Sequence, residues 1–371
     1  MQQILYASAD YAELDQYFTQ TGAKSILLVC DGAFRFLRIK AYFDTLEKRL
    51  GIRVVPFSDF QPNPRYESVV GGVKLFRAEQ CDLVAAVGGG SAMDVAKCIK
   101  LYADMDSSEN YLKQTIVPND IPLFAVPTTA GTGSEATRYA VIYYNGEKQS
   151  VADYSCIPSA VLFDASVLKT LPLYQKKSTM LDALCHAVES YWSVNSNAES
   201  MGYAREAIRM ILANQESYLA NSESGNANML KAANTAGKAI NITQTTAGHA
   251  MCYKLTSLYG ISHGHAAALC DKALIPYMMQ HTEQCIDPRG TAHLEKVLAE
   301  IADAFGCQKT ELAARFAAVV DALELSVPAV RTPEELDILK TSVNPVRLKN
   351  HPVALDTETI ESLNRQILRQ E

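Results

Sequence analysis

The sequence predicts two domains, an α/β domain with a mostly parallel sheet over residues 1–174 and an all-helical domain over residues 175–371. Three observations support this division. The 371 residues are enough for two domains with separate hydrophobic cores. In the first half, short apolar runs alternate with segments of helical spacing, a pattern typical of βαβ units. After residue 172 the strand patterns end, and apolar residues recur at positions i, i+3 and i+4.

The apolar runs of the first half predict strands that are buried in a parallel sheet, with helices as their connections. The predicted strands are 25–31, 52–57, 82–87 and the start of 121–135, and segment 148–172 is strand-rich. The predicted helices are 33–50, 67–80 and the part of 88–103 that follows its glycines. The second half predicts helices at 181–194, 200–219, 227–243 and 293–305, and capped terminal helices at 332–340 and 357–368.

The composition is that of an ordinary soluble globular protein, with 48% hydrophobic and 20% charged residues. Its 41 acidic and 34 basic residues give a net charge of −7, which disfavours nucleic acid or an anionic membrane as a partner. The N-terminus lacks a secretory signal pattern, and no apolar run is long enough to span a bilayer. Nine scattered cysteines without CxxC pairs favour free thiols and a cytoplasmic location.

Four residues of the second half form a candidate metal site. Asp182 and His186 are four residues apart, so on a helix they project from one face. His249 and His263 follow in separate segments, each beside a glycine. Three imidazoles and one carboxylate suit a divalent first-row metal such as Fe(II) or Zn(II). For each histidine alone, the alternative is a hydrogen-bonded core or surface residue, and three of only seven histidines are committed here.

Two loops of the first half have the composition of nucleotide-binding turns. The glycines of GGGS (88–91) let backbone amides approach a phosphate, and the helix that follows favours negative charge at its N-terminus. This loop differs from the spaced GxGxxG fingerprint of a first βα turn. Thr128, Thr129 and Thr132 supply hydroxyls for a phosphate or a nicotinamide amide, or alternatively form a turn that caps the next helix.

Asp31 stands at the end of the first predicted strand. In that position it can accept hydrogen bonds from a ribose diol and would repel a 2′-phosphate, which favours NAD over NADP. The alternative role is to cap the following helix.

Four segments together resemble the iron-containing (group III) alcohol dehydrogenases: GGGSAMDVAK, PTTAGTGSE, the Asp182–His186 pair, and His249 with His263-Gly264. The resemblance runs in order over nearly the whole chain. It implies the dehydroquinate synthase-like fold, with an N-terminal dinucleotide-binding domain and a helical metal-binding domain. It also implies metal-dependent, NAD(P)H-linked reduction of a small aldehyde to a primary alcohol, with Fe2+ as the metal and Zn2+ as the alternative.

The resemblance assigns residues to two sets of contacts. The metal ligands are Asp182, His186, His249 and His263. The contacts to NAD(H), or to NADP(H) as the alternative, are Asp31, Gly89, Gly90, Ser91, Asp94, Thr128, Thr129, Thr132 and Lys148. Homodimers or larger homo-oligomers are the implied assembly.

One position departs from the family pattern. Many relatives carry a histidine four residues after the third ligand, proposed as a proton relay, and here that residue is Tyr253. An unperturbed phenol titrates near pH 10, so it relays protons less well at neutral pH. His265, or the cofactor ribose with water, is the alternative relay.

A finer resemblance is to the phosphonoacetaldehyde reductases of this family, carried by segments 57–76, 182–200, 249–270 and 342–355. It implies reduction of phosphonoacetaldehyde to 2-hydroxyethylphosphonate, and such an anionic substrate needs a cation, for which Lys254 and Arg138 are the candidates. The first alternative is a general short-chain alcohol, 1,3-propanediol or butanol dehydrogenase. The second is a glycerol-1-phosphate dehydrogenase-like enzyme or a non-catalytic relative.

Overall fold

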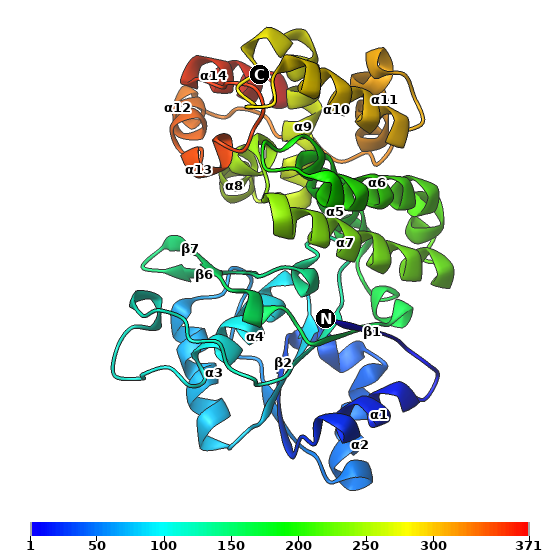
Figure 1. Cartoon of the computed structure of the whole chain (residues 1–371), viewed down its shortest axis with the longest axis vertical. Coiled ribbons are helices and arrows are strands. Elements are labelled where there is room, and N and C mark those ends of the chain that lie inside the picture. Colours follow the sequence, from blue (N-terminus) through cyan, green and yellow to red (C-terminus); the bar gives the residue numbers. More distant parts are fainter. Residues whose placement is uncertain (1, 370–371) are drawn as a thin grey trace. The chain divides into compact units, whose positions relative to one another are not determined.

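The computed structural model describes residues 2–369, and by their contacts these fall into two compact units. The first unit contains the chain up to Leu171 together with Ala220–Asn234, and the second contains Pro172–Leu219 and the chain from Thr235 onward. Figure 1 follows the chain through both units by colour. The predicted boundary at residue 174 lies three residues after Leu171, and the return of Ala220–Asn234 to the first unit was not predicted.

A six-stranded parallel sheet forms the centre of the first unit, in the order β1-β8-β5-β4-β2-β3. Every residue of β2, β4 and β5 is buried, as their Val-, Leu- and Ala-rich sequences predict for strands covered on both faces. The strands are β1 (Gln3–Tyr6), β2 (Ser25–Cys30), β3 (Arg53–Phe57), β4 (Leu83–Gly88), β5 (Leu123–Pro127) and β8 (Ala160–Phe163).

Four α-helices connect these strands: α1 (Ala12–Thr21), α2 (Ile39–Leu50), α3 (Tyr66–Ala78) and α4 (Gly90–Tyr102). The single helix predicted at 33–50 is wrong in its first turns. A short 3-10 helix occupies Gly32–Phe36, and Leu37 is extended with ψ 140°, so α2 begins only at Ile39. The cause is local: the Asp31 carboxylate accepts a hydrogen bond from the Ala33 amide at 2.8 Å and caps the shorter turn.

An antiparallel hairpin of β6 (Tyr139–Tyr144) and β7 (Glu147–Ala152) also belongs to the first unit. Asn145 and Gly146 form its two-residue turn with φ values of 52° and 80°, which Asn-Gly pairs adopt readily. The strand-rich segment 148–172 therefore contains most of β7 and all of β8, joined by a 3-10 turn at Tyr154–Cys156.

Lys97 on α4 ties this hairpin and the threonine loop before it to the sheet. Its side chain is fully buried, and its ammonium donates to the backbone carbonyls of Ser134 (2.5 Å), Thr137 (2.7 Å) and Tyr139 (2.7 Å). A buried charge needs this number of acceptors to offset its lost hydration. Lys97 thus holds the loop after β5 against the helix that follows β4.

Helices are the regular elements of the described part of the second unit, as predicted, and only isolated β-bridges such as Cys285–Val353 occur beside them. Its helices are α5 (Leu173–Trp192), α6 (Ala198–Leu219), the end of α7 (Glu223–Thr243), α8 (Ala247–Tyr259), α9 (His263–Gln280), α10 (Thr291–Ala304), α11 (Leu312–Asp321), α12 (Pro333–Thr341), α13 (Pro345–Leu348) and α14 (Thr357–Ile367). Helix α9 lies at the centre, in contact with α5, α8, α11 and α14. Figure 1 shows α5 and α9 with the other helices of this unit around them.

Gly264 allows α9 to approach α5 closely. A Cβ atom at this position would lie 2.1 Å from the Ser178 carbonyl oxygen and 2.5 Å from the Asp182 Cβ. Both separations are shorter than van der Waals contact, so no larger residue fits without moving one helix. The glycine beside His263 therefore sets the distance between the two helices that carry Asp182 and His263.

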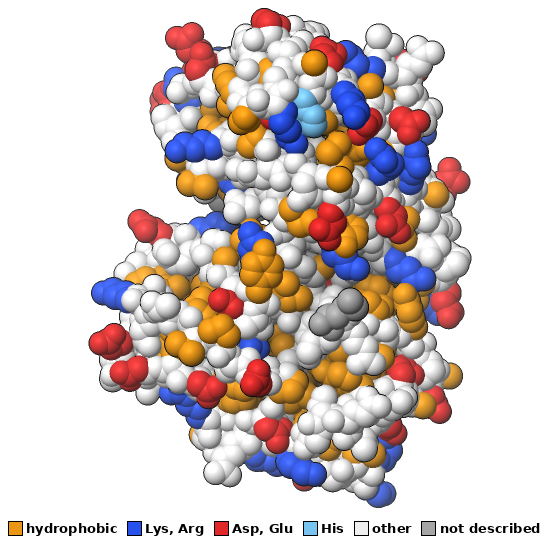
Figure 2. All heavy atoms as spheres, in the orientation of Figure 1, with side chains coloured by type: hydrophobic (Ala, Val, Ile, Leu, Met, Phe, Trp, Pro, Cys, Tyr) orange, Lys and Arg blue, Asp and Glu red, His pale blue; other side chains and the backbone are white. Residues whose placement is uncertain are grey.

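Within the described residues, no helix combines the length and the apolar character needed to span a membrane. On the face shown in Figure 2, Lys and Arg side chains are interspersed with Asp and Glu side chains. A mixed surface of this kind agrees with the modest net charge of −7.

We expect Lys97→Met to lower the free energy of unfolding by about 3 kcal/mol, because three carbonyls lose a charged donor in a buried setting. Lys100→Met is the matched control on the same helix. Lys100 is also buried but donates to one carbonyl, that of Asn119 (2.8 Å), so its replacement should cost only about 1 kcal/mol. Urea denaturation measures both, and equal losses would contradict the anchoring role of Lys97.

Gly264→Ala should destabilise the second unit by about 3 kcal/mol, because the added methyl overlaps the α5 backbone. Gly202→Ala on α6 has no heavy atom within 4 Å of the new methyl and should stabilise by about 0.5–1 kcal/mol. Chemical denaturation of the two variants tests the close approach. A Gly264→Ala protein as stable as Gly202→Ala would show that α5 and α9 do not meet in this way.

Candidate metal centre

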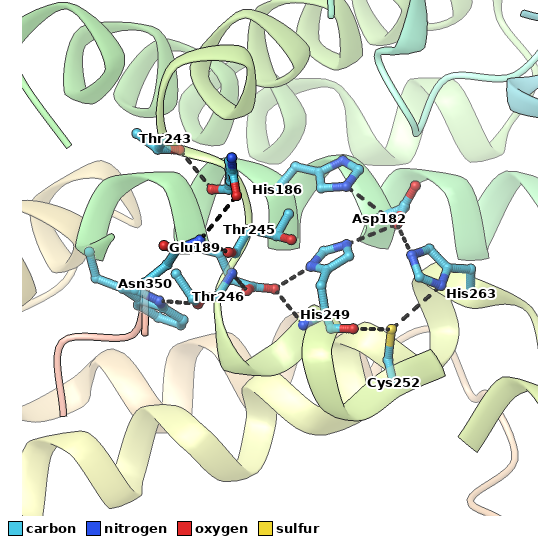
Figure 3. A network of polar contacts seen from close by, with 12 residues as sticks. Asp182, His186, Glu189, Thr243, Thr245, Thr246, His249, Cys252, His263 and Asn350 are labelled. Atoms are coloured by element: carbon cyan, nitrogen blue, oxygen red, sulfur yellow. Dashed lines mark hydrogen bonds and ion pairs between the residues drawn. The ribbon is translucent and has the colours of Figure 1, made fainter. Parts of the chain in front are cut away.

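The four predicted metal ligands converge within the second unit, from three helices (Figure 3). Asp182 and His186 project from successive turns of α5, His249 stands in the first turn of α8, and His263 is the first residue of α9. Asp182, His186 and His249 are buried, and the His263 side chain is 38% exposed. The cluster is therefore reachable from one side, through His263.

Three imidazole nitrogens surround one carboxylate oxygen. The Nε2 atoms of His249, His186 and His263 lie 3.5, 4.0 and 4.0 Å from Oδ1 of Asp182. The ring of His186 stacks on that of His249, with centroids 4.4 Å apart and planes at 13°. Asp182, His249 and His263 each offer one ligand atom, and these three atoms lie within 4.8 Å of one another. His186 joins them through its approach to Oδ1 of Asp182.

The residues fit a small divalent ion. Oδ1 of Asp182 and Nε2 of His249 are buried, and neither atom has a hydrogen-bond partner among the described residues. Such orphaned buried atoms are costly unless another group satisfies them. Two ligand atoms bound at about 2.1 Å to one tetrahedral ion lie about 3.4 Å apart, close to the separations found here. Three nitrogens and one oxygen suit Fe(II) or Zn(II).

The electrostatics of the cluster agree with a cation site. Burial alone would raise the pKa of Asp182, but His186, His249 and His263 lower it well below its usual range. Burial disfavours a charged His249 ring, yet the carboxylates of Glu189 and Asp182 raise the pKa of His249 to about 10. Without an ion, the protonated His249 ring therefore offsets the charge of the ionised carboxylates, and a metal cation would compete with its proton.

Glu189 is a site residue that the sequence reasoning missed. It is fully buried on α5, and its carboxylate bonds to Nδ1 of His249, on the side of the ring away from Asp182 (Figure 3). A signal was present, because Asp182, His186 and Glu189 occupy positions i, i+4 and i+7 and so share one helix stripe.

The three predicted catalytic residues differ in their relation to the cluster. The Tyr253 ring stacks on His263, with centroids 5.4 Å apart and planes at 15°. His265 is buried, and its Nδ1 lies 3.2 Å from the Tyr174 hydroxyl. Since it follows His263 by two residues on α9, it projects to the opposite side of that helix. Lys254 is half-buried on α8 and projects about 140° around the helix from His249.

The predicted cofactor residues gather at the carboxyl ends of the central strands. Cys30 pairs with Val87, and Gly88 pairs with Pro127, so Asp31, the glycine loop and Thr128 follow at one sheet edge. Space there is tight: Cβ atoms on Gly89 and Gly90 would lie 3.3 and 3.1 Å from the methyl groups of Thr129 and Thr132. The two loops thus contact each other beside the N-terminus of α4, which begins at Gly90 and includes Ser91.

Two of the predicted cofactor residues, Asp94 and Lys148, lie outside the contact between the glycine loop and the threonine loop. Asp94 bonds with the Ser134 hydroxyl at 3.2 Å, beneath the threonine loop. Burial raises the pKa of Asp94 to about 6, although Lys97 opposes the shift. Lys148 is exposed on β7. Arg138, the second candidate for an anion contact, donates to the Tyr154 hydroxyl at 2.6 Å.

Two family models match the chain and together cover most of it. Residues 2–165 match the model of the iron-containing alcohol dehydrogenases, and residues 176–345 match that of the C-terminal region of the Fe-containing alcohol dehydrogenase family. The predicted metal, iron, agrees with this description.

Curated relatives lead to the same family. The chain is 33% identical to a 1,3-propanediol dehydrogenase of Klebsiella pneumoniae over 317 residues, which cover 83% of this chain and 78% of that protein. It is 29% identical to a phosphonoacetaldehyde reductase of Streptomyces viridochromogenes over 313 residues, 80% of this chain and 79% of that protein.

Solved structures share the fold over nearly the full length. A sulfoacetaldehyde reductase from Bifidobacterium kashiwanohense in complex with NAD+ superposes with a TM-score of 0.87 at 24% identity, covering 99% of this chain and 96% of that one. A 1,3-propanediol oxidoreductase gives a TM-score of 0.86 at 26% identity, covering 99% and 98%. The chain belongs to the iron-containing alcohol dehydrogenase family and is an oxidoreductase.

Proposed function

We propose that this enzyme uses NADH and one iron ion, held by Asp182, His186, His249 and His263, to reduce phosphonoacetaldehyde to 2-hydroxyethylphosphonate. Membership of the family accounts for the general part of this reaction, the interconversion of an aldehyde and an alcohol. The observation that supports the site is the convergence of three Nε2 atoms on one buried carboxylate oxygen.

When bound, the metal would act as a Lewis acid on the carbonyl oxygen of the aldehyde, and the reduced nicotinamide would supply hydride to its carbon. Asp182 and the three histidines would hold the cation from the buried side. The negative charge of Asp182 strengthens cation binding, and burial of three of the four ligands strengthens every electrostatic interaction in the cluster.

Tyr253 is the residue we propose as proton donor to the alcohol product. Its ring lies against His263, the most exposed of the four ligands, so its hydroxyl is near the side from which a substrate enters. His265 fits this role less well, because its ring bonds with Tyr174 on another face of α9. The step moves one proton from the Tyr253 hydroxyl, and water restores it.

The dinucleotide is proposed to lie at the sheet edge formed by the ends of β2, β4 and β5. Backbone amides of Gly90 and Ser91, in the first turn of α4, would donate to its phosphates, and Asp94, Thr128, Thr129, Thr132 and Lys148 stay in the proposed contact set. Asp31 caps its helix through Oδ1, so the second oxygen can accept from a ribose hydroxyl. Its negative charge supports NAD over NADP, and the NAD+ complex of the sulfoacetaldehyde reductase is consistent with this choice.

The choice of substrate rests on two relatives. The names of the phosphonoacetaldehyde reductase and the sulfoacetaldehyde reductase both describe two-carbon aldehydes that carry a strong anion. Lys254 is the proposed cation for that group. The second candidate function is a general 1,3-propanediol or butanol dehydrogenase, which the 33% identical relative favours. The Asp/His/His/His ligand set and the two family models speak against the glycerol-1-phosphate dehydrogenase branch.

A cytoplasmic location and a homodimer or larger homo-oligomer complete the proposal. All nine cysteines are free, and free thiols persist best in a reducing compartment.

His263→Ala should remove the bound metal and lower turnover by on the order of 10³-fold, because one of the four ligands is lost. NADH binding, followed by cofactor fluorescence, should be unchanged. Metal content per chain and steady-state rates measure the first two effects. The exposed His281, which pairs with Glu283, provides the control variant His281→Ala. Full activity in a metal-free preparation of the wild-type protein would exclude the proposal.

The catalytic efficiency for phosphonoacetaldehyde should exceed that for propanal by about 10–100-fold, the range expected for a charge-assisted contact of 1.5–3 kcal/mol. Lys254→Ala should abolish most of this preference and leave propanal reduction unchanged, whereas Lys296→Ala, at an exposed position, should alter neither. Steady-state kinetics with both aldehydes decides between the two candidate functions. Equal losses for both substrates in Lys254→Ala would dismiss Lys254 as the anion contact.

A further inference from the structure

The buried carboxylate of Glu189 receives four hydrogen bonds from α8 and the residue before it. Oε2 accepts from the Thr246 amide (2.6 Å) and the Thr246 hydroxyl (2.7 Å). Oε1 accepts from the His249 amide (3.1 Å) and contacts the His249 Nδ1 atom. Figure 3 shows Glu189 on the opposite side of the His249 ring from Asp182.

The direction of each of these hydrogen bonds is fixed by chemistry. A backbone N–H group can only donate a hydrogen bond, and the same holds for the indole N–H of Trp192. The Trp192 Nε1–H donates to the Thr246 hydroxyl oxygen at 2.8 Å. Because that oxygen accepts from Trp192, its own proton is directed to Glu189. Both oxygens of Glu189 are therefore surrounded by donors, and Nδ1 of His249 must also present a proton to them.

From this network we propose that Glu189 is a positioning residue for the metal, one that keeps the proton of His249 on Nδ1 and leaves the Nε2 lone pair directed at the ion. Nε2 of His249 faces Oδ1 of Asp182 at 3.5 Å, where the proposed metal would lie. Hydrogen bonding at one imidazole nitrogen decides which nitrogen is available as a ligand. This inference rests on the metal site of the proposed function and adds the residue that orients its most buried histidine.

Gly248 makes the contact sterically feasible. A Cβ atom at Gly248 would lie 2.8 Å from Oε1 of Glu189 and 2.1 Å from Oδ1 of Asp271. Glu189 and Asp271 thus both approach the backbone beside His249, and both are fully buried. No hydrogen bond joins Asp271 to His249 among the described residues. Asp271 is therefore a matched control, a carboxylate that is equally buried but does not orient His249.

Glu189→Gln tests the proposal, because glutamine keeps the size of the side chain but replaces one acceptor by an NH2 donor. If the NH2 group faces Thr246, it meets an amide that can only donate. If it faces His249, the ring must accept at Nδ1 and carry its proton on Nε2, where it blocks the metal. Either arrangement should weaken metal binding by about 10–100-fold, the usual effect of losing a partner behind a ligand.

Co2+ serves as the probe, with its visible absorption followed during titration of metal-free protein. We expect a 10–100-fold higher Kd and an altered Co2+ spectrum for Glu189→Gln, and values within about threefold of wild type for Asp271→Asn. Thermal unfolding of the metal-free proteins checks that both variants fold. If Glu189→Gln does not fold, Thr246→Val, which removes one donor, should raise the Kd at least threefold on the same reasoning.

Two outcomes would overturn the inference. One is a Co2+ affinity of Glu189→Gln, or of Thr246→Val in its place, that equals the wild-type value. The other is an equal loss in Asp271→Asn, which would indicate a general effect of altering this buried region. Failure of the proposed function gives a different result: wild-type protein that binds Co2+ but reduces no aldehyde would reject the reaction and leave the role of Glu189 intact.

Discussion

The attraction between one buried carboxylate oxygen and three imidazole nitrogens is the constraint on which the account of this enzyme depends. Oδ1 of Asp182 lies inside a helical unit, away from water and without a hydrogen bond among the described residues. Such an arrangement is unfavourable unless positive charge occupies the space between the oxygen and the nitrogens. Protons can supply that charge, and a divalent cation can supply more of it at a single point.

The surrounding helices are arranged to maintain this constraint. Gly264 lets α9 lie against α5, and Gly248 lets the start of α8 approach Glu189. The two glycines therefore determine where His263 and His249 stand. Glu189 then orients His249 from behind, and the indole of Trp192 fixes the Thr246 hydroxyl that completes the network. Close packing of the helices and directed hydrogen bonds thus together position the four ligand residues.

Much of the fold and of the metal site could be predicted from the sequence. The remaining features could not be predicted, and the causes are physical. The strands β2, β4 and β5 are continuous apolar runs, so the sequence predicts them directly. Asp182 and His186 are four residues apart on one helix, so their pairing is also predictable from local spacing. The break at Leu37 depends on which backbone amide Asp31 caps. An aspartate at this position could equally cap a longer helix, so the sequence does not distinguish the two. The bond between Glu189 and His249 joins residues 60 positions apart, a pairing that no local pattern encodes.

Anomalous X-ray diffraction at the iron absorption edge, from crystals of the iron-loaded enzyme, tests the central claim most directly. The account predicts one strong anomalous peak per chain, bounded by Oδ1 of Asp182 and the Nε2 atoms of His186, His249 and His263. A peak bound by other residues, or a fully loaded active enzyme with no peak among these four atoms, would contradict it.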